Sequence, residues 1–255
     1  MMKHLMSQLS FDGRRLILRN ASFLFFSLLM PAGFYLLFTR VMIVGTTAEM
    51  QVFNVTYMGS MIVYSGLISA AFSVASILKH DRDQGFVNLL NLTPRGLTTY
   101  YVSIALWSLV MTTLAIGVIG GLAMGVNHVS LSGGQWLGVL GVSLFGQIPL
   151  LIMGAMMAFI QHTETLGLVS NLVTFPMAIV SGLWWSISLL PDWLQQIGKV
   201  MPAYFTNSLL EKVTTGGEIE LNSVIGIVLW SLILFATMIL ISKLTHKWGV
   251  KFGRA

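Results

Sequence analysis

The chain has 255 residues, of which 55% are apolar and only 9% are charged. A soluble domain carries about 25% charged residues, so this composition excludes an ordinary soluble protein and indicates a membrane protein. The absence of cysteine excludes disulfides and thiolate metal sites, and the basic residues behind the net charge of +5 lie between apolar runs rather than on one surface, which argues against nucleic acid as a partner.

Long uncharged runs are the main feature of the sequence, because a membrane-spanning helix needs about 20 mainly apolar residues. Four runs hold one such helix each, and the run at residues 96–163 is long enough for two. We therefore predict an all-α membrane protein with six spans, organised as a single domain over residues 1–255. The predicted spans are at about residues 21–38, 55–78, 98–126, 136–160, 166–188 and 223–242.

The amino-terminal segment, residues 1–20, combines an apolar stripe with basic residues, among them Arg14, Arg15 and Arg19. This pattern favours an amphipathic helix lying in the membrane interface, and a disordered basic tail is the alternative. Pro31 falls near the middle of the first span, where it should kink the helix.

Residues 79–101 form the longest polar interruption between spans two and three. Within them Phe86, Leu89 and Leu90 stand at positions i, i+3 and i+4, which predicts a short amphipathic helix. Thr93 and Pro94 then begin the next span, since proline is tolerated in the first turn of a helix. The short helix has two interpretations: it lies on the lipid surface, or it is a coupling helix seated in a groove of a partner protein.

Residues 189–222 are too polar to span a membrane, yet they hold two amphipathic fragments. Pro191 precedes one fragment, which contains Trp193, and Pro202 precedes the other, which contains Phe205. Proline before an apolar face is a helix-start signal. We predict two short helices that lie on or dip into the outer leaflet.

Basic residues predict the orientation, because cytoplasmic loops carry an excess of Lys and Arg. With the amino terminus inside, only Arg40, Lys199 and Lys212 of the 14 basic residues would lie outside. The pattern predicts a multi-pass protein of the cell membrane with both termini in the cytoplasm.

The sequence shows no sign of catalysis or of an internal energy source. None of the five histidines has the HExxH spacing of a metalloprotease, and no GxxxxGK[ST] stretch is present to bind ATP. All nine acidic residues fall in predicted loops or at span ends, whereas ion-coupled transporters place carboxylates inside their spans. We expect no catalytic residue, metal or cofactor on this chain, and we expect its energy to come from a partner.

The order of these features resembles the permease subunits of type-2 ABC exporters, the ABC-2 family that includes daunorubicin-type drug and antibiotic exporters. After the second span the family has an acid–basic–acid cluster, then x-G, a short apolar helix and T-P. The matching residues here are Asp81, Arg82, Asp83, Gln84, Gly85, Leu89, Leu90, Thr93 and Pro94. The segments around Pro191, Trp193 and Pro202 resemble the family's two re-entrant helices before the last span. The chain departs from the pattern at Asp81 and Asp83, where Glu is usual, at Phe86, where a small residue is common, and at Asn88, where an acid is common.

The resemblance implies one half of a transport pathway, completed by a second identical or similar permease chain. Two copies of a separate P-loop ABC ATPase, which binds ATP and Mg, would dock on residues 79–101. Closure of the ATPases would push on the short helix, residues 1–20 would act as a gate at the inner leaflet, and the outer helices would close the exit. The implied cargo is a hydrophobic or amphipathic compound, such as a drug, an antibiotic, an antimicrobial peptide or a lipid-like molecule. Export of such a compound would confer multidrug or antibiotic resistance.

Two alternatives stay open at this stage. The same fold could export sodium or a polysaccharide or glycolipid precursor. The chain could also be a non-transporting membrane protein, with residues 79–101 serving as a docking or sensor surface.

Overall fold

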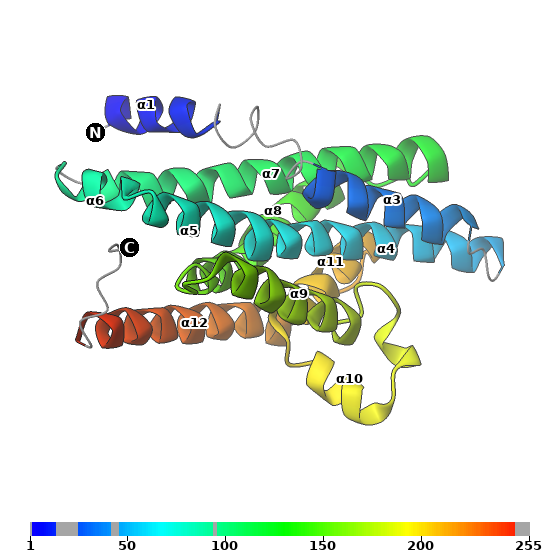
Figure 1. Ribbon diagram of the computed structural model, residues 1–255. Helices are drawn as coiled ribbons and strands as arrows, with labels where there is room; N and C mark the ends of the chain where they lie inside the picture. The colour runs from blue at the N-terminus through cyan, green and yellow to red at the C-terminus, as the bar shows by residue number, and fades with distance from the viewer. Residues whose placement is uncertain (1, 14–24, 42–45, 94–95, 248–255) are drawn as a thin grey trace.

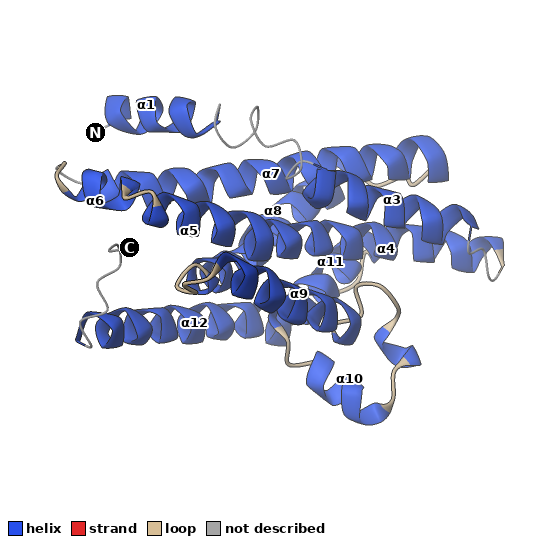
Figure 2. Ribbon diagram, viewed as in Figure 1, coloured by secondary structure: helices blue, strands red, loops and turns tan. Residues whose placement is uncertain are grey.

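The computed structural model describes residues 2–13, 25–41, 46–93 and 96–247. Every regular element in these ranges is a helix (Figures 1 and 2). Within the described ranges, five helical stretches are long and apolar enough to cross a membrane: Ala48–Asp83, Leu97–Asn127, Gly133–Met157, Thr163–Val180 and Leu221–Lys243. The predicted all-α membrane class is therefore confirmed.

The first predicted span is described only from Phe25 onward. It consists of the π-helical turn η2 (Phe25–Leu29), helix α3 (Met30–Leu36) and the π-helical turn η3 (Leu37–Val41). Pro31 lies in the first turn of α3, directly after η2. Because proline has no N–H to donate, it fits a place where the hydrogen-bond pattern changes. The apolar part of this stretch is shorter than the five spans, and a sixth span stays a prediction.

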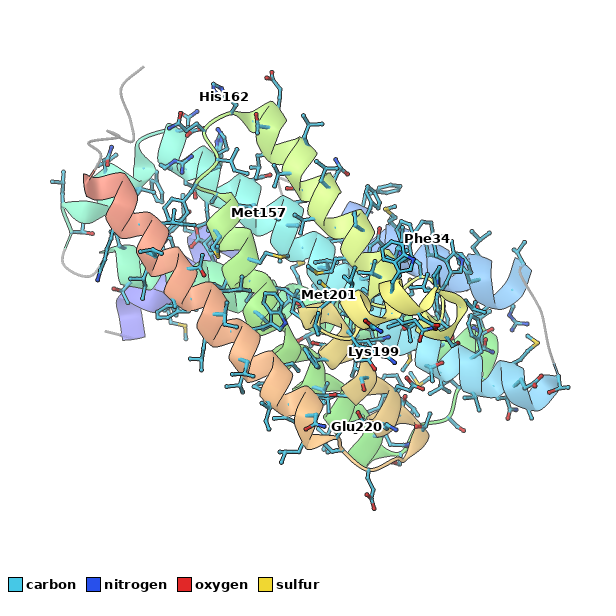
Figure 3. The ribbon with its side chains drawn as sticks, turned by 90° about the horizontal axis from the view of Figure 1, so that it is seen from below. Phe34, Met157, His162, Lys199, Met201 and Glu220 are labelled. Carbon is cyan, nitrogen blue, oxygen red and sulfur yellow. The ribbon has the colours of Figure 1, made fainter. Side chains whose placement is uncertain are left out.

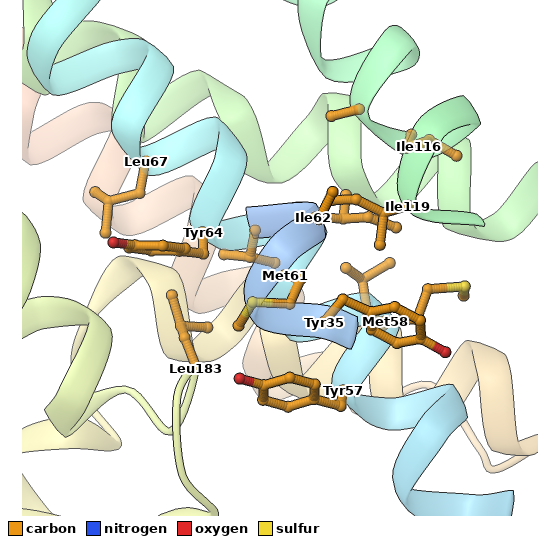
Figure 4. Close-up of a cluster of buried hydrophobic side chains, with 14 of the residues drawn as sticks. Tyr35, Tyr57, Met58, Met61, Ile62, Tyr64, Leu67, Ile116, Ile119 and Leu183 are labelled. Atoms are coloured by element: carbon orange, nitrogen blue, oxygen red, sulfur yellow. The ribbon is translucent and has the colours of Figure 1, made fainter. Parts of the chain in front are cut away.

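One long helix runs through the centre of the bundle. It is built from α4 (Thr47–Ile68), the π-helical turn η4 (Ser69–Val74) and α5 (Ala75–Asp83). This helix is largely buried, unlike the other candidate spans. Figure 4 shows its side chains Met58, Met61 and Ile62 in one cluster with Tyr35 of α3 and Ile119 of α7. Burial of these large side chains stabilises the bundle around the central helix.

The remaining long helices surround the central one. Helices α7 (Gly96–Asn127) and α8 (Gly133–Met157) pack along α4, and α9 (Thr163–Val180) covers η4 and α5. Helix α12 (Leu221–Lys247) packs on α8 and α11 (Pro202–Thr215), and most of its surface is exposed and apolar. A long apolar helix with so little protein around it is suited to contact with lipid.

Side chains of α8 and α9 contact backbone carbonyls of the central helix near η4. Gln147 Nε2 donates to the Gly66 carbonyl oxygen over 3.1 Å, and Ser170 Oγ donates to that of Ala71 over 2.8 Å. Gly154 lies so close that a Cβ there would stand 2.2 Å from the Ala70 carbonyl oxygen. Helices α8 and α9 therefore both contact the central backbone at or near the π-helical turn.

Two helices differ in extent from the spans predicted on them. Helix α4 begins at Thr47, before residue 55, because Thr46 and Glu49 form a capping box there. Helix α9 ends at Val180, before residue 188. Gly182 has φ 75°, and the Leu183 N–H donates to the Ala178 carbonyl over 2.9 Å, so the chain leaves the helix in a Schellman turn.

The two ends of the bundle differ. Figure 1 shows α1 (Met2–Gly13), α6 (Phe86–Asn91) and the last turns of α12 at one end, which we call the α6 end. The amino-terminal end of α4 lies at the opposite end, which we call the far end. Figure 3 shows His162, in the turn between α8 and α9, far from Glu220, which precedes α12.

Candidate functional site

The predicted coupling segment is a sharp corner at the α6 end. Helix α5 ends at Asp83, Gln84 and Gly85 make the turn, and α6 follows directly. Gly85 has φ 73°, a left-handed conformation that costs other residues free energy, and its N–H donates to the Arg82 carbonyl over 3.0 Å. The left-handed backbone of the turn therefore explains why a glycine stands at this position of the x-G pattern.

The charged residues before the corner bind the protein itself. Lys79, with 4% of its surface exposed, forms an ion pair with Asp83 one turn further along. Asp81, with 3% exposed, accepts a hydrogen bond from the Tyr100 hydroxyl of α7. Both bonds compensate the cost of burying charged groups, and the bond from Tyr100 also holds α5 against α7.

Arg82 connects the corner to α8. Its guanidinium donates to the carbonyl oxygens of Ala158, over 2.5 Å, and Ile160, over 3.2 Å. These carbonyls follow the last turn of α8, where backbone oxygens lack helical donors and where a cation is favourable. The acid–basic–acid cluster thus holds α5, α7 and α8 together.

Helix α6 divides its apolar residues between the protein and the surroundings. Phe86 packs its ring against Tyr100, with 5.8 Å between the ring centroids, and Leu90 packs on the same cluster. Leu89 and Leu92 are 65% and 83% exposed. Of the three residues expected to form the docking face, Leu89 alone is exposed. Leu92, three positions after Leu89, is also exposed, and it was not among the residues predicted for the docking face.

The end of this segment is described only in part. The Thr93 hydroxyl donates to the Leu90 carbonyl over 2.8 Å and so satisfies one carbonyl at the end of α6. Gln84, in the turn of the corner, is exposed. Pro94 lies outside the described residues.

Helix α1 is docked along α7. Asp12, which is fully buried, accepts hydrogen bonds from Ser103 Oγ over 2.7 Å and from Gln8 Nε2 over 2.9 Å. Trp107 Nε1 donates to the Leu9 carbonyl over 2.9 Å. A Cβ on Gly13 would stand 2.2 Å from the Trp107 ring, so a side chain there would prevent this approach.

Asp12 and Gly13, which interrupt the apolar pattern of this segment, are therefore where α1 contacts the bundle. Its predicted partners in the gate, Arg14, Arg15 and Arg19, lie outside the described residues.

Two short helices stand at the far end, α10 (Asp192–Gly198) and α11. Pro191 is the amino-terminal cap of α10, and Trp193 in its first turn is exposed. Pro202 begins α11, and Phe205 lies against α12, where a Cβ on Gly226 would stand 2.6 Å from its ring. Helix α10 is thus a surface element.

Helix α11 lies inside the bundle. The Ser60 hydroxyl of α4 donates to Asn207 Oδ1 over 2.9 Å, and Thr206 fills the space above Gly146 of α8. Burial raises the pKa of the Tyr204 phenol, and the nearby carboxylates of Glu220 and Glu211 raise it further. This phenol therefore stays neutral in the physiological range.

The described residues contain no group of three or more His, Cys, Asp or Glu side chains placed to hold a metal ion.

Two comparisons with known proteins give a consistent result. The family model described as ABC-2 family transporter protein matches residues 41–242, which include the corner, α10 and α11. The "Putative transport permease YvfS" of Bacillus subtilis (strain 168) is 30% identical over 203 residues, which are 79% of this chain and 82% of that protein. No solved structure matches the chain.

Proposed function

Because the chain belongs to the ABC-2 family of transporters, we propose that it is the membrane permease subunit of an ATP-driven exporter. A separate P-loop ABC ATPase, present in two copies, binds ATP and Mg and supplies the energy. The permease pathway is completed by a second copy of this chain or by a similar chain. The protein lies in the cell membrane with its α6 end and both termini in the cytoplasm.

The exposed leucines of α6 and of its carboxyl-terminal cap are the observation that supports the ATPase coupling most directly. They are Leu89 and Leu92. Asp81, Arg82 and Phe86 attach this corner to the rest of the bundle. A load on these leucines is passed through Phe86 to Tyr100 and α7, and through Arg82 to the end of α8. A helix lying on lipid would need exposed leucines but would not need this set of internal contacts.

A hydrophobic or amphipathic compound is the cargo that the composition favours. The five candidate spans are apolar, and none of the charged residues of this chain lies midway along them. Sodium or a charged glycan precursor would have to cross without compensating charges, which is costly in hydrocarbon. A hydrophobic or amphipathic drug, antibiotic, antimicrobial peptide or lipid-like molecule could instead cross along apolar walls.

Co-purification tests the ATPase partnership. The tagged permease is expressed with the ABC ATPase encoded nearest to it, purified in mild detergent, and the bound ATPase is quantified. The double variant Leu89→Glu/Leu92→Glu should lose the ATPase while it still inserts into the membrane. Ile219→Glu, at an exposed apolar residue of the far end, is the matched control and should retain it.

ATPase bound equally by the double variant and the control would overturn the assignment of α6 as the coupling helix. Absence of any P-loop protein with the unmodified permease would overturn the exporter function itself.

A further inference from the structure

A large apolar cavity lies between α5, α7, α8 and α12 at the α6 end. Its volume is about 790 Å³, and its wall includes Leu78 of α5, Ile104 of α7, Leu151 of α8 and Ile239 of α12. Cavities that bind small ligands measure roughly 300–1,000 Å³ and are mainly apolar. This cavity is therefore large enough for a ligand with an extended hydrocarbon part.

The wall of the cavity includes apolar side chains at the surface of the bundle. Val102 of α7 and Phe235 and Ile239 of α12 line it and are exposed. Both helices are candidate membrane spans, and lipid tails are as apolar as leucine. The cavity is thus accessible to lipid chains between α7 and α12.

Among the described residues of the wall, two are charged, Arg82 and Lys243, and both are basic. Arg82 donates to two carbonyls and stands 3.7 Å from Asp83, which also pairs with Lys79. Lys243 is exposed, and it forms no ion pair with any acidic residue in the described part of the chain. Among the described residues at this cavity, Lys243 is therefore the basic residue without an acidic partner.

The depth of these residues matches that of a lipid headgroup. Lys243 is the last residue of the candidate span Leu221–Lys243, and Arg82 lies one residue before the end of Ala48–Asp83. Basic residues at span ends lie at headgroup level, and basic pockets between membrane helices bind anionic lipid headgroups.

We propose that this cavity binds one acyl chain of an anionic phospholipid, whose phosphate pairs with Lys243. The lipid is a resident of the permease, held between α7 and α12 and separate from the exported compound. The inference depends on the membrane placement of α12 and does not depend on the ATPase or on the cargo.

Lipid binding to the purified full-length chain tests the headgroup. Bound phosphatidylglycerol and phosphatidylcholine are counted by native mass spectrometry over a titration of each lipid. Phosphatidylglycerol should bind more tightly, and Lys243→Gln should weaken it about fivefold, the effect expected for one lysine near a headgroup. Lys199→Gln, at an exposed lysine of the far end, should leave binding unchanged. Equal binding of both lipids, or no effect of Lys243→Gln, would overturn the proposal.

A second variant tests the cavity itself. Ala105 lines the cavity on α7, so Ala105→Trp should fill it and remove the bound phosphatidylglycerol. Leu106→Trp, at the next residue and outside the wall, should not. Retention of the lipid by a folded Ala105→Trp protein would show that the acyl chain of the lipid lies outside this cavity. If Ala105→Trp does not fold, Lys243→Gln decides, because it changes only an exposed side chain.

Discussion

The ring of Phe11 in α1 lies 6.4 Å from the ring of Phe86 in α6, between centroids, and the two planes are 27° apart. Phe86 also contacts Tyr100 of α7. The amino-terminal helix and the corner at residues 79–93 are thus in direct contact, although the sequence separates them by the whole of the central helix. A displacement of α6 must therefore disturb the packing of α1 on the bundle.

Phe11→Ala should loosen α1 without unfolding the bundle. Phe11 is itself partly exposed, and an aromatic contact contributes about 0.5–1.5 kcal/mol beyond area burial. Because the chain has no cysteine, Ser10→Cys gives a unique site for a spin label on α1. We expect the label to become more mobile when Phe11 is replaced.

Phe53→Ala is the matched control for this experiment, because Phe53 stacks on Tyr57 in α4, with 5.1 Å between centroids, away from α1. A label that is equally immobile in the Phe11→Ala protein would mean that Asp12 and Trp107 hold α1 without the aromatic pair.

Arg82→Gln should destabilise the corner. The variant loses two charge-assisted hydrogen bonds to the end of α8, and such bonds contribute about 1.5–3 kcal/mol each when protected from water. Since Arg82 retains some exposure, a total loss of about 2 kcal/mol is expected. The stability of Arg82→Lys should lie between those of the unmodified protein and Arg82→Gln, because an ammonium keeps the charge but cannot form the guanidinium's paired bonds.

Thermal unfolding in detergent measures this effect, with Arg40→Gln at an exposed arginine as the reference. Equal melting temperatures for the two glutamine variants would contradict a structural role of Arg82.

Gly154→Ala should be strongly destabilising. Its Cβ would stand 2.2 Å from the Ala70 carbonyl oxygen, a backbone atom that cannot rotate away, so α8 would have to move from the central helix. Overpacking of this kind costs about 1–3 kcal/mol. Gly141→Ala, on the same helix with no atom near its Cβ, should be neutral or slightly stabilising. Similar melting temperatures for both alanine variants would rule out the close approach.

Gly85→Ala should strain the corner, because its left-handed backbone costs an L-residue about 1–2 kcal/mol. Gly85→Asn should cost less, since asparagine tolerates this conformation better. Hydrogen exchange of α6 amides checks the order: fastest in the alanine variant, intermediate in the asparagine variant and slowest with glycine. Identical exchange in all three would mean that the turn adopts another conformation.

The elements of the fold that depend on local sequence were predictable. The corner at Gly85, the helix after it and the starts at Pro191 and Pro202 all follow from patterns within a few residues. The capping box at Thr46 and Glu49 was equally visible as a T-x-x-E pattern, and the Ser181-Gly182 pair marked the end of α9. These two signals indicate where helix α4 begins and where helix α9 ends.

The features that depend on distant contacts were not predictable from periodicity. Phe86, Leu89 and Leu90 share one apolar stripe in the sequence, but Tyr100 and Phe11 turn Phe86 inward and leave Leu89 exposed. In the sequence Asp12 interrupts the apolar stripe of the amino-terminal segment, whereas in the fold it accepts a hydrogen bond from Ser103 of α7. Helical spacing identifies a face, and only the packing of other helices decides whether that face is covered.

The π-helical turn Ser69–Val74 also limits where the chain can change in length. Each of its hydrogen-bonded rings holds one residue more than those of the α-helix before and after it. Deletion of one residue inside this turn can restore an uninterrupted α-helix and still leave Asp81 against Tyr100 and Arg82 against Ala158. The same deletion elsewhere in α4 or α5 would turn both side chains by about 100° around the helix axis. Relatives that differ by one residue along this helix should therefore carry the gap between Ser69 and Val74.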